Sequence, residues 1–162
     1  MKLANYVYDE WIEGDGDGIA LTDPVSGEEL VRVSSDGVEV ARALAFARGN
    51  GGPALRALGY EARAAKLGEI AAVLTAHRSD YFDIALKNSG STEADAAFDI
   101  DGAIFTLKSY ARAGKPLGAA RLLKEGARVP LAKTDAFQGQ HFLMPLTGVA
   151  VFINAFNFPA WG

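Results

Sequence analysis

The sequence contains no cysteine and only two histidines among its 162 residues. Without cysteine, a disulfide scaffold, a zinc site with thiolate ligands and a thiol nucleophile are all excluded within these residues. Sixteen basic side chains against 20 acidic ones give a formal net charge of −4, which excludes the basic footprint of a nucleic-acid-binding domain. No run reaches the length of about 18 apolar residues that a membrane span needs. The N-terminus also lacks the apolar core of a signal peptide, so we expect a cytoplasmic protein without a nucleic-acid or membrane partner.

Hydrophobic residues make up 49% of the chain and charged residues 22%, a balance typical of a folded domain. Short apolar segments predict strands over residues 5–33. One hairpin turns at Asp9-Glu10, and a second turns through Asp23-Pro24-Val25-Ser26-Gly27. Proline presets φ early in such a turn, and glycine accepts a positive φ near its end.

Residues 35–114 are rich in alanine and predict helices. A first helix over about residues 38–48 is expected to break at residues 49–53 (GNGGP), and Asn88-Ser89-Gly90 is expected to end the third. One apolar stripe at helical spacing consists of Leu67, Ile70, Ala71 and Leu74.

The last helix is predicted to begin after Ser91 or Thr92, either of which can cap it, and to run to about Ala113. Its apolar face is predicted to consist of Ala97, Ile100, Ile104, Leu107 and Ala111. Its charged residues are expected to be mostly solvated, namely Asp95, Asp99, Asp101 and Lys108.

Strand patterns return from residue 128, where residues 129–132 are expected to pair with residues 137–144. Residues 149–153 (VAVFI) then form the most apolar run, which is typical of a strand buried on both faces of a parallel sheet. Because no later segment could cover that strand, we expect the chain to be the N-terminal part of a larger protein.

Several residues could suggest a metal-binding or catalytic site, but their spacing fits such a site poorly. The loop Gly14–Gly18 alternates Gly and Asp but lacks the downstream glutamate of a calcium-binding EF-hand loop. His77 stands near a helix C-terminus, and His141 has no carboxylate at ligand spacing. We therefore expect no metal site, and no P-loop or Gly-x-Gly-x-x-Gly motif is present.

The segment from Ile153 to Gly162 (INAFNFPAWG) follows the predicted buried strand, the place where α/β proteins bind ligands. Asn157 stands there between two phenylalanines. Its side-chain oxygen could simply cap a following helix, in whose first turn Pro159 fits well. Alternatively, its amide nitrogen could serve a reaction. The residues alone leave both interpretations open.

Four motifs in the same order resemble the aldehyde dehydrogenase superfamily. Asn157-Phe158-Pro159 matches its signature, and residues 23–28 (DPVSGE) are similar to its N-terminal Asn-Pro-x-x-Gly-Glu turn. Residues 61–74 resemble its arginine-bearing helix, and residues 87–91 (KNSGS) the end of the next helix. The resemblance covers nearly the whole chain. The amino-acid sequence of residues 153–162 most resembles the branch that oxidises CoA-linked semialdehydes in the breakdown of aromatic acids.

The resemblance implies a mechanism and its residues. In the family, a cysteine thiolate attacks the aldehyde, hydride passes to a nicotinamide cofactor, and glutamate-activated water hydrolyses the thioester. Both the cysteine and the glutamate would lie beyond residue 162. Asn157 would donate its side-chain N–H to the developing oxyanion. The cofactor, NADP by analogy with the branch and NAD as the alternative, would lie along Ile153, Asn154, Ala155 and Phe156. Gly102 and Phe158 would line the substrate tunnel, although a packing glycine also explains Gly102.

The implied fold is α/β. Residues 1–128 and 146–162 would form the N-terminal part of the cofactor domain, with its helices and first strand, and residues 129–145 would supply strands of the oligomerisation sheet of a homodimer. The catalytic domain would be absent from this chain. The substrate would be an acyl-CoA semialdehyde. Within the branch, the alternative is the dehydrogenase domain of the phenylacetate-pathway ring-opening enzyme. A different class, a non-catalytic oligomerisation module, applies if the protein ends at Gly162.

Overall fold

The computed structural model describes residues 1–155 and 157–162. Its N-terminal part consists of two antiparallel hairpins, β1 (Asn5–Val7) with β2 (Glu10–Ile12) and β3 (Ile19–Thr22) with β4 (Glu29–Val33). Both predicted hairpins are confirmed. The first turn is centred one residue earlier than predicted, on Tyr8 and Asp9, which both have positive φ.

The second hairpin turn is held by its own side chains. The carboxylate of Asp23 accepts hydrogen bonds from the backbone N–H groups of Val25 (2.7 Å) and Ser26 (3.1 Å). These bonds lower the pKa of Asp23, because they stabilise its ionised form. The turn therefore forms by the local chemistry that its sequence predicts.

The first helical stretch differs from the prediction. Helix α1 (Val40–Phe46) continues through a π-helical turn, η1 (Ala47–Gly51), into α2 (Gly52–Ala57). The expected break at residues 49–53 is therefore wrong. Gly51 and Gly52 adopt right-handed helical angles, and Pro53 lies in the first turn of α2, where its missing N–H costs little.

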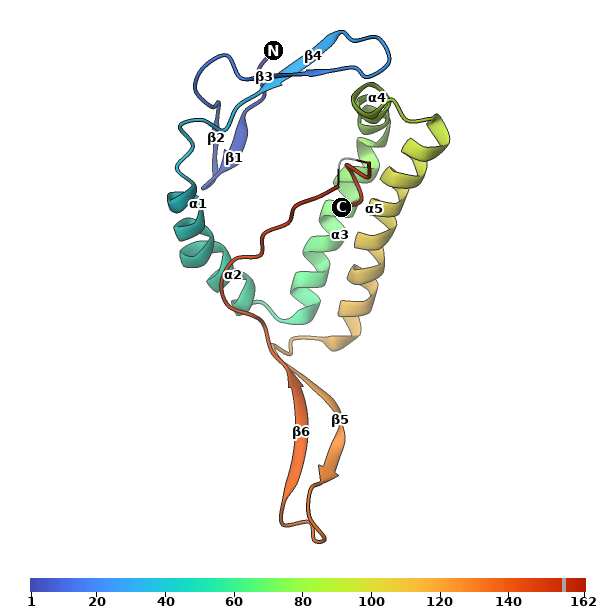
Figure 1. Cartoon of the computed structure of the whole chain (residues 1–162). Coiled ribbons are helices and arrows are strands. Elements are labelled where there is room, and N and C mark those ends of the chain that lie inside the picture. The colour runs from blue at the N-terminus through green and yellow to red at the C-terminus, as the bar shows by residue number, and fades with distance from the viewer. Residues whose placement is uncertain (156) are drawn as a thin grey trace.

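Three further helices, α3 (Tyr60–Ala76), α4 (Arg78–Ser89) and α5 (Glu93–Gly114), form the main body. Helices α3 and α5 run side by side, and α4 lies across their upper end near the second hairpin (Figure 1). Gly90 ends α4 with a left-handed φ of 63°, and the Thr92 hydroxyl caps α5 by accepting the N–H of Asp95. Thr92, and not Ser91, is thus the cap.

Small residues let α3 and α5 approach closely. Ala64 and Ala71 of α3 are buried, and a Cβ on Gly114 of α5 would lie 2.7 Å from the Cβ of Ala64. The core behind them consists of Ala85, Ala96, Ile100 and Ile104, with Leu74, Tyr81, Phe82 and Leu86 packed against it. The predicted stripe on α3 is confirmed at Ala71 and Leu74, whereas Ile70 is 49% exposed.

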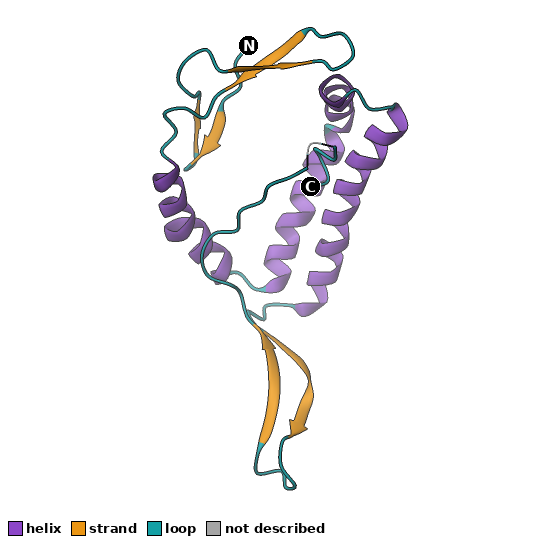
Figure 2. Ribbon diagram, viewed as in Figure 1, coloured by secondary structure: helices purple, strands orange, loops and turns teal. Residues whose placement is uncertain are grey.

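After a short 3₁₀ turn, η2 (Lys115–Leu117), strands β5 (Leu123–Pro130) and β6 (Gln138–Leu143) form a long antiparallel hairpin. Its strands pair as predicted, but the first begins at Leu123, six residues before residue 129. The hairpin projects away from the helices, as Figure 2 shows. Each sheet among the described residues is a two-stranded antiparallel hairpin.

Candidate functional site

The chain returns from β6 to the helices as an extended segment, drawn in red in Figure 1. The prediction of a buried strand at residues 149–153 is wrong: Val151 is 74%, Phe152 81% and Ile153 94% exposed. We find no backbone hydrogen bond made by residues 149–155 within the described part of the chain. A strand needs a neighbour to satisfy its N–H and C=O groups, and no described strand lies beside this segment.

Beyond this segment, residues 158–162 form a single helical turn against α5. The turn is closed by a hydrogen bond from the N–H of Gly162 to the carbonyl of Phe158. The N–H groups of Ala160 and Trp161 both donate to the carboxylate of Asp99 on α5, at 3.0 and 2.9 Å. The turn is thus joined to the middle of α5 by two charge-assisted hydrogen bonds.

Asp99 is only 4% exposed, so the prediction that it is solvated is wrong. Burial of a carboxylate is unfavourable unless hydrogen bonds replace its water, and the two N–H groups of the turn do so. The sequence held a weak signal of this burial, because Asp99 directly precedes Ile100 of the predicted apolar face and lies three residues after another apolar residue, Ala96. Asp95 and Asp101 are exposed, as predicted.

Aromatic packing fixes the same turn. The indole of Trp161 lies against Gly102, where an added Cβ would come within 2.5 Å of the ring, and its Nε1 donates to Thr106 Oγ1 at 3.0 Å. Phe98 contacts both Trp161 and Phe158 edge-to-face, with centroid distances of 5.2 and 6.5 Å. The atoms nearest to Gly102 therefore belong to the turn.

Asn157 directly precedes this turn and is exposed. It lines a groove of ≈ 730 Å³ between the Pro24 turn, the end of α4 and the first turns of α5, together with Phe158, Asn88 and Asp95. Within the described part of the chain, the Asn157 amide has no hydrogen-bond partner. The Ala160 N–H, which a capping Asn157 oxygen would accept, is bonded to Asp99 instead.

The residues predicted to contact a cofactor lie just before Asn157. Ile153, Asn154 and Ala155 are exposed, and their extended backbone is free within the described residues. The Asn154 side chain lies beside Gly162. Phe156, the fourth predicted residue, lies outside the described residues.

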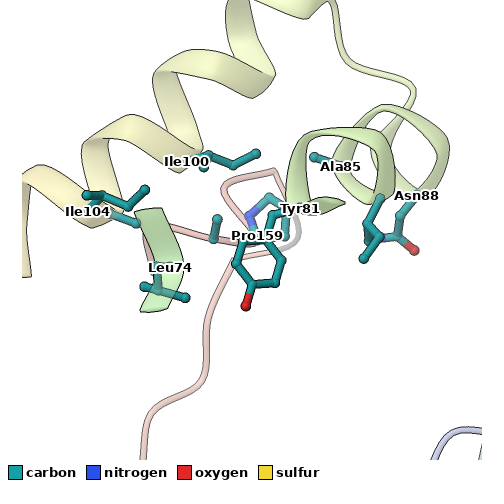
Figure 3. A pocket seen from close by; sticks show the side chains of 10 residues that line it. Leu74, Tyr81, Ala85, Asn88, Ile100, Ile104 and Pro159 are labelled. Atoms are coloured by element: carbon teal, nitrogen blue, oxygen red, sulfur yellow. The ribbon is translucent and has the colours of Figure 1, made fainter. Parts of the chain in front are cut away.

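A second cavity, which the sequence did not indicate, lies behind the turn. Figure 3 shows side chains of α3, α4 and α5 around Pro159. The cavity has a volume of ≈ 280 Å³ and is lined mainly by apolar groups, namely Leu74, Tyr81, Ile84, Ala85, Asn88, Ile100, Ala103, Ile104, Pro159 and Ala160. The cavity and the groove of Asn157 share Ala85, Asn88 and Pro159 as lining residues.

The ionisable groups around the site are mostly solvent-exposed. Arg78 of α4 donates to both carboxylate oxygens of Asp101, from Nε at 2.7 Å and from Nη2 at 2.8 Å. These hydrogen bonds, and then the charge of Arg78, lower the pKa of Asp101. Among the described residues, no three His, Cys, Asp or Glu side chains cluster as a metal site would require. None of the described helices combines the length and hydropathy of a membrane span.

Residues 11–161 match the aldehyde dehydrogenase family. The chain belongs to this family. It is 77% identical over all 162 residues to the 3,4-dehydroadipyl-CoA semialdehyde dehydrogenase of Aromatoleum evansii, and it spans 32% of that protein's length. The predicted α/β fold and the family resemblance are both confirmed.

Solved structures of the family share the fold. The NAD-dependent benzaldehyde dehydrogenase of Corynebacterium glutamicum matches 83% of the chain with a TM-score of 0.64 at 20% identity, over 28% of its own length. An E. coli NADP-dependent enzyme matches 82% with a TM-score of 0.66 at 26% identity, over 26% of its length. Aldehyde dehydrogenase 21 from Physcomitrella patens, in complex with the product succinate, matches 83% with a TM-score of 0.67 at 19% identity, over 26% of its length.

Proposed function

We propose that this chain is the N-terminal part of an enzyme that oxidises 3,4-dehydroadipyl-CoA semialdehyde to the carboxylic acid. The observation that carries the proposal is the 77% identity, over every residue of the chain, to a dehydrogenase of that semialdehyde. The cysteine nucleophile and the glutamate base belong to the part of the enzyme beyond Gly162. The alternative is the dehydrogenase domain of the phenylacetate-pathway ring-opening enzyme, which no observation of similar weight supports.

Asn157 supplies the oxyanion donor. When the thiolate adds to the aldehyde carbon, the carbonyl oxygen becomes negative, and an N–H held nearby stabilises it. Two features support this role. The amide is exposed in a groove, and the Ala160 N–H that a capping Asn157 oxygen would accept donates to Asp99 instead. Asn157 is therefore not used as a helix cap, and its amide nitrogen can face a substrate.

The exposed segment Ile153–Ala155 suits the cofactor, because unpaired backbone groups can bind a ribose and the adjoining nicotinamide. Phe156 completes the proposed set. This segment would hold the dinucleotide, which would supply the hydride acceptor for the oxidation. We assign NADP, in line with the E. coli NADP-dependent neighbour, and keep NAD as the alternative because the benzaldehyde dehydrogenase uses it.

Phe158 and Gly102 are our candidates for the substrate tunnel. Phe158 lines the groove of Asn157, which supports its assignment. Gly102 has the Trp161 indole as its nearest neighbour, which favours a packing role. Residues of both α4 and α5 line this groove.

The assembly that we propose is a cytoplasmic homodimer, in which residues 129–145 form part of the oligomerisation sheet. Exposed apolar side chains on the β5–β6 hairpin, including Val129, Phe137 and Phe142, support a buried role in an assembly. A non-catalytic oligomerisation module is the second candidate, and the same exposed hairpin favours it. Turnover by the complete protein distinguishes the two.

The test of the proposed function is Asn157→Ala in the complete enzyme, assayed with 3,4-dehydroadipyl-CoA semialdehyde and each nicotinamide cofactor. We expect kcat to fall by about 10²–10³, with a small change in the KM of the cofactor. Asn157→Asp should be at least as damaging, because a carboxylate would oppose the forming charge. The matched control is Asn50→Ala, a distant asparagine in η1, which should leave kcat unchanged. Activity of Asn157→Ala within a few-fold of wild type refutes the oxyanion role.

A further inference from the structure

The proposed function does not involve the buried carboxylate of Asp99. The residue stands in the middle of α5, and its two oxygens accept the N–H groups of Ala160 and Trp161, more than 60 positions later in the chain. Both partners belong to the turn that begins immediately after Asn157. The carboxylate therefore acts on the segment that carries the proposed oxyanion donor.

The hydrogen bonds that the backbone N–H groups of Ala160 and Trp161 donate to Asp99 fix the backbone of the turn relative to α5. The other contacts come from side chains: Trp161 lies on Gly102 and bonds Thr106, and Phe158 contacts Phe98. Residues 149–155, on the other side of Asn157, have no backbone hydrogen bond within the described chain. Among the described residues, the contacts that hold the backbone next to Asn157 thus come from its C-terminal side.

We infer that Asp99 is a positioning residue, whose carboxylate holds the Phe158–Gly162 turn so that the amide of Asn157 is presented to the reacting oxygen. The inference rests on the proposed function of Asn157. Preorganised donors stabilise a developing charge only when they are held in place before the reaction. A displacement of about 1 Å can cost about 10²-fold in rate.

The chemistry of the contact requires a carboxylate of this length. Aspartate offers two acceptor oxygens to two N–H groups, whereas asparagine offers one oxygen and an NH₂ group that would face the second N–H. Glutamate keeps both oxygens but places them one methylene further from α5. Neither replacement can bind both Ala160 and Trp161 in the observed geometry.

The experiment compares Asp99→Asn with Asp101→Asn in the complete enzyme. The control residue lies two positions along α5, is exposed and bonds Arg78 instead of the turn. We expect Asp99→Asn to lower kcat by about 10- to 100-fold while the KM of the cofactor changes by less than about 3-fold. Asp101→Asn should change kcat by less than about 2-fold.

A double-mutant cycle with Asn157→Ala separates positioning from a general structural role. If Asp99 acts through Asn157, Asp99→Asn costs little further activity once the amide is gone. Full additivity of the two losses overturns the inference and leaves the role of Asn157 intact. An Asn157→Ala enzyme of near-normal kcat removes the proposed function, and the inference with it.

Asp99→Glu provides a second test in case Asp99→Asn does not fold, because it retains the negative charge. We expect a folded enzyme, by circular dichroism and thermal unfolding, with kcat lowered and the same non-additivity with Asn157→Ala. If both Asp99 variants fail to give folded protein, Asp99 serves folding alone and the inference is wrong. Wild-type kcat in a folded Asp99→Asn enzyme also overturns it.

Discussion

The carboxylate of Asp99 and the backbone N–H of Trp161 lie 2.9 Å apart, although 62 positions separate them in the chain. The indole of the same Trp161 covers Gly102, one helical turn further along α5. A single face of α5 thus provides both a polar and an apolar contact to the turn after Asn157. The two contacts should be separable by mutation.

The apolar contact is tested by Gly102→Ala. An alanine usually stabilises a helix relative to glycine by roughly 1 kcal/mol. Here its Cβ would come within 2.5 Å of an indole that Phe98 and Thr106 hold in place. Overpacking of this kind costs about 1–3 kcal/mol. We therefore expect a lower midpoint of thermal unfolding for the variant enzyme.

The matched control is Gly68→Ala on α3, where the nearest atom to an added Cβ is that of Ala111 at 3.9 Å. This variant should keep or raise the unfolding midpoint, because the helix gains propensity without a clash. Equal stabilisation by both substitutions would show that Trp161 does not press on Gly102 in solution.

Local chemistry made much of this fold predictable. The Asp23 turn, the Thr92 cap and the left-handed Gly90 each depend on residues within three or four positions of one another. Such interactions form in almost any tertiary context. The Asn157-Phe158-Pro159 motif can likewise be recognised from the sequence, because the residues of the family signature are consecutive.

The incorrect predictions have different causes. Asp99 resembles its charged neighbours in sequence, and its burial depends on a turn more than 60 positions away. Residues 149–153 carry the hydrophobicity of a buried strand, but hydrophobicity does not supply the neighbouring strands that burial requires. At residues 49–53 the glycines were expected to break the helix, yet glycine also adopts right-handed helical angles.

The ion pair between Arg78 and Asp101 should stabilise the α4–α5 contact only weakly. Both side chains are about half exposed, at 41% and 54%, so water screens the pair and we expect only a weak coupling near neutral pH. Hydrogen bonds from Arg78 lower the pKa of Asp101 in the folded chain. The coupling is therefore complete above the ordinary value of 3.8 and disappears as the pH falls through the lowered one.

The measurement is a double-mutant cycle of Arg78→Ala and Asp101→Asn, with urea unfolding midpoints recorded at pH 7 and well below pH 3.8. Asp83→Asn, an exposed aspartate on α4, provides the control and should show no coupling to Arg78. A coupling that persists unchanged in acid would mean that the two side chains interact through packing and not through charge.

The β5–β6 hairpin tests the proposed dimer. A two-stranded hairpin is marginally stable alone and leaves both edges unpaired. Val129 and Phe142 are 58% and 49% exposed on it, a pattern that favours contact with a second subunit. We expect Val129→Lys and Phe142→Lys in the complete enzyme to shift the species seen by light scattering from dimer toward monomer, because a buried lysine must lose its hydration.

The same substitution on a surface outside the hairpin is the control. Val25→Lys, in the β3–β4 turn, places lysine at a valine that is 81% exposed and should leave the dimer intact. Circular dichroism of each variant separates dissociation from unfolding. A wild-type enzyme that is monomeric at micromolar concentration would refute the proposed dimer. Hairpin variants that remain fully dimeric would place the interface on another surface, because a charge at either position cannot be buried without cost.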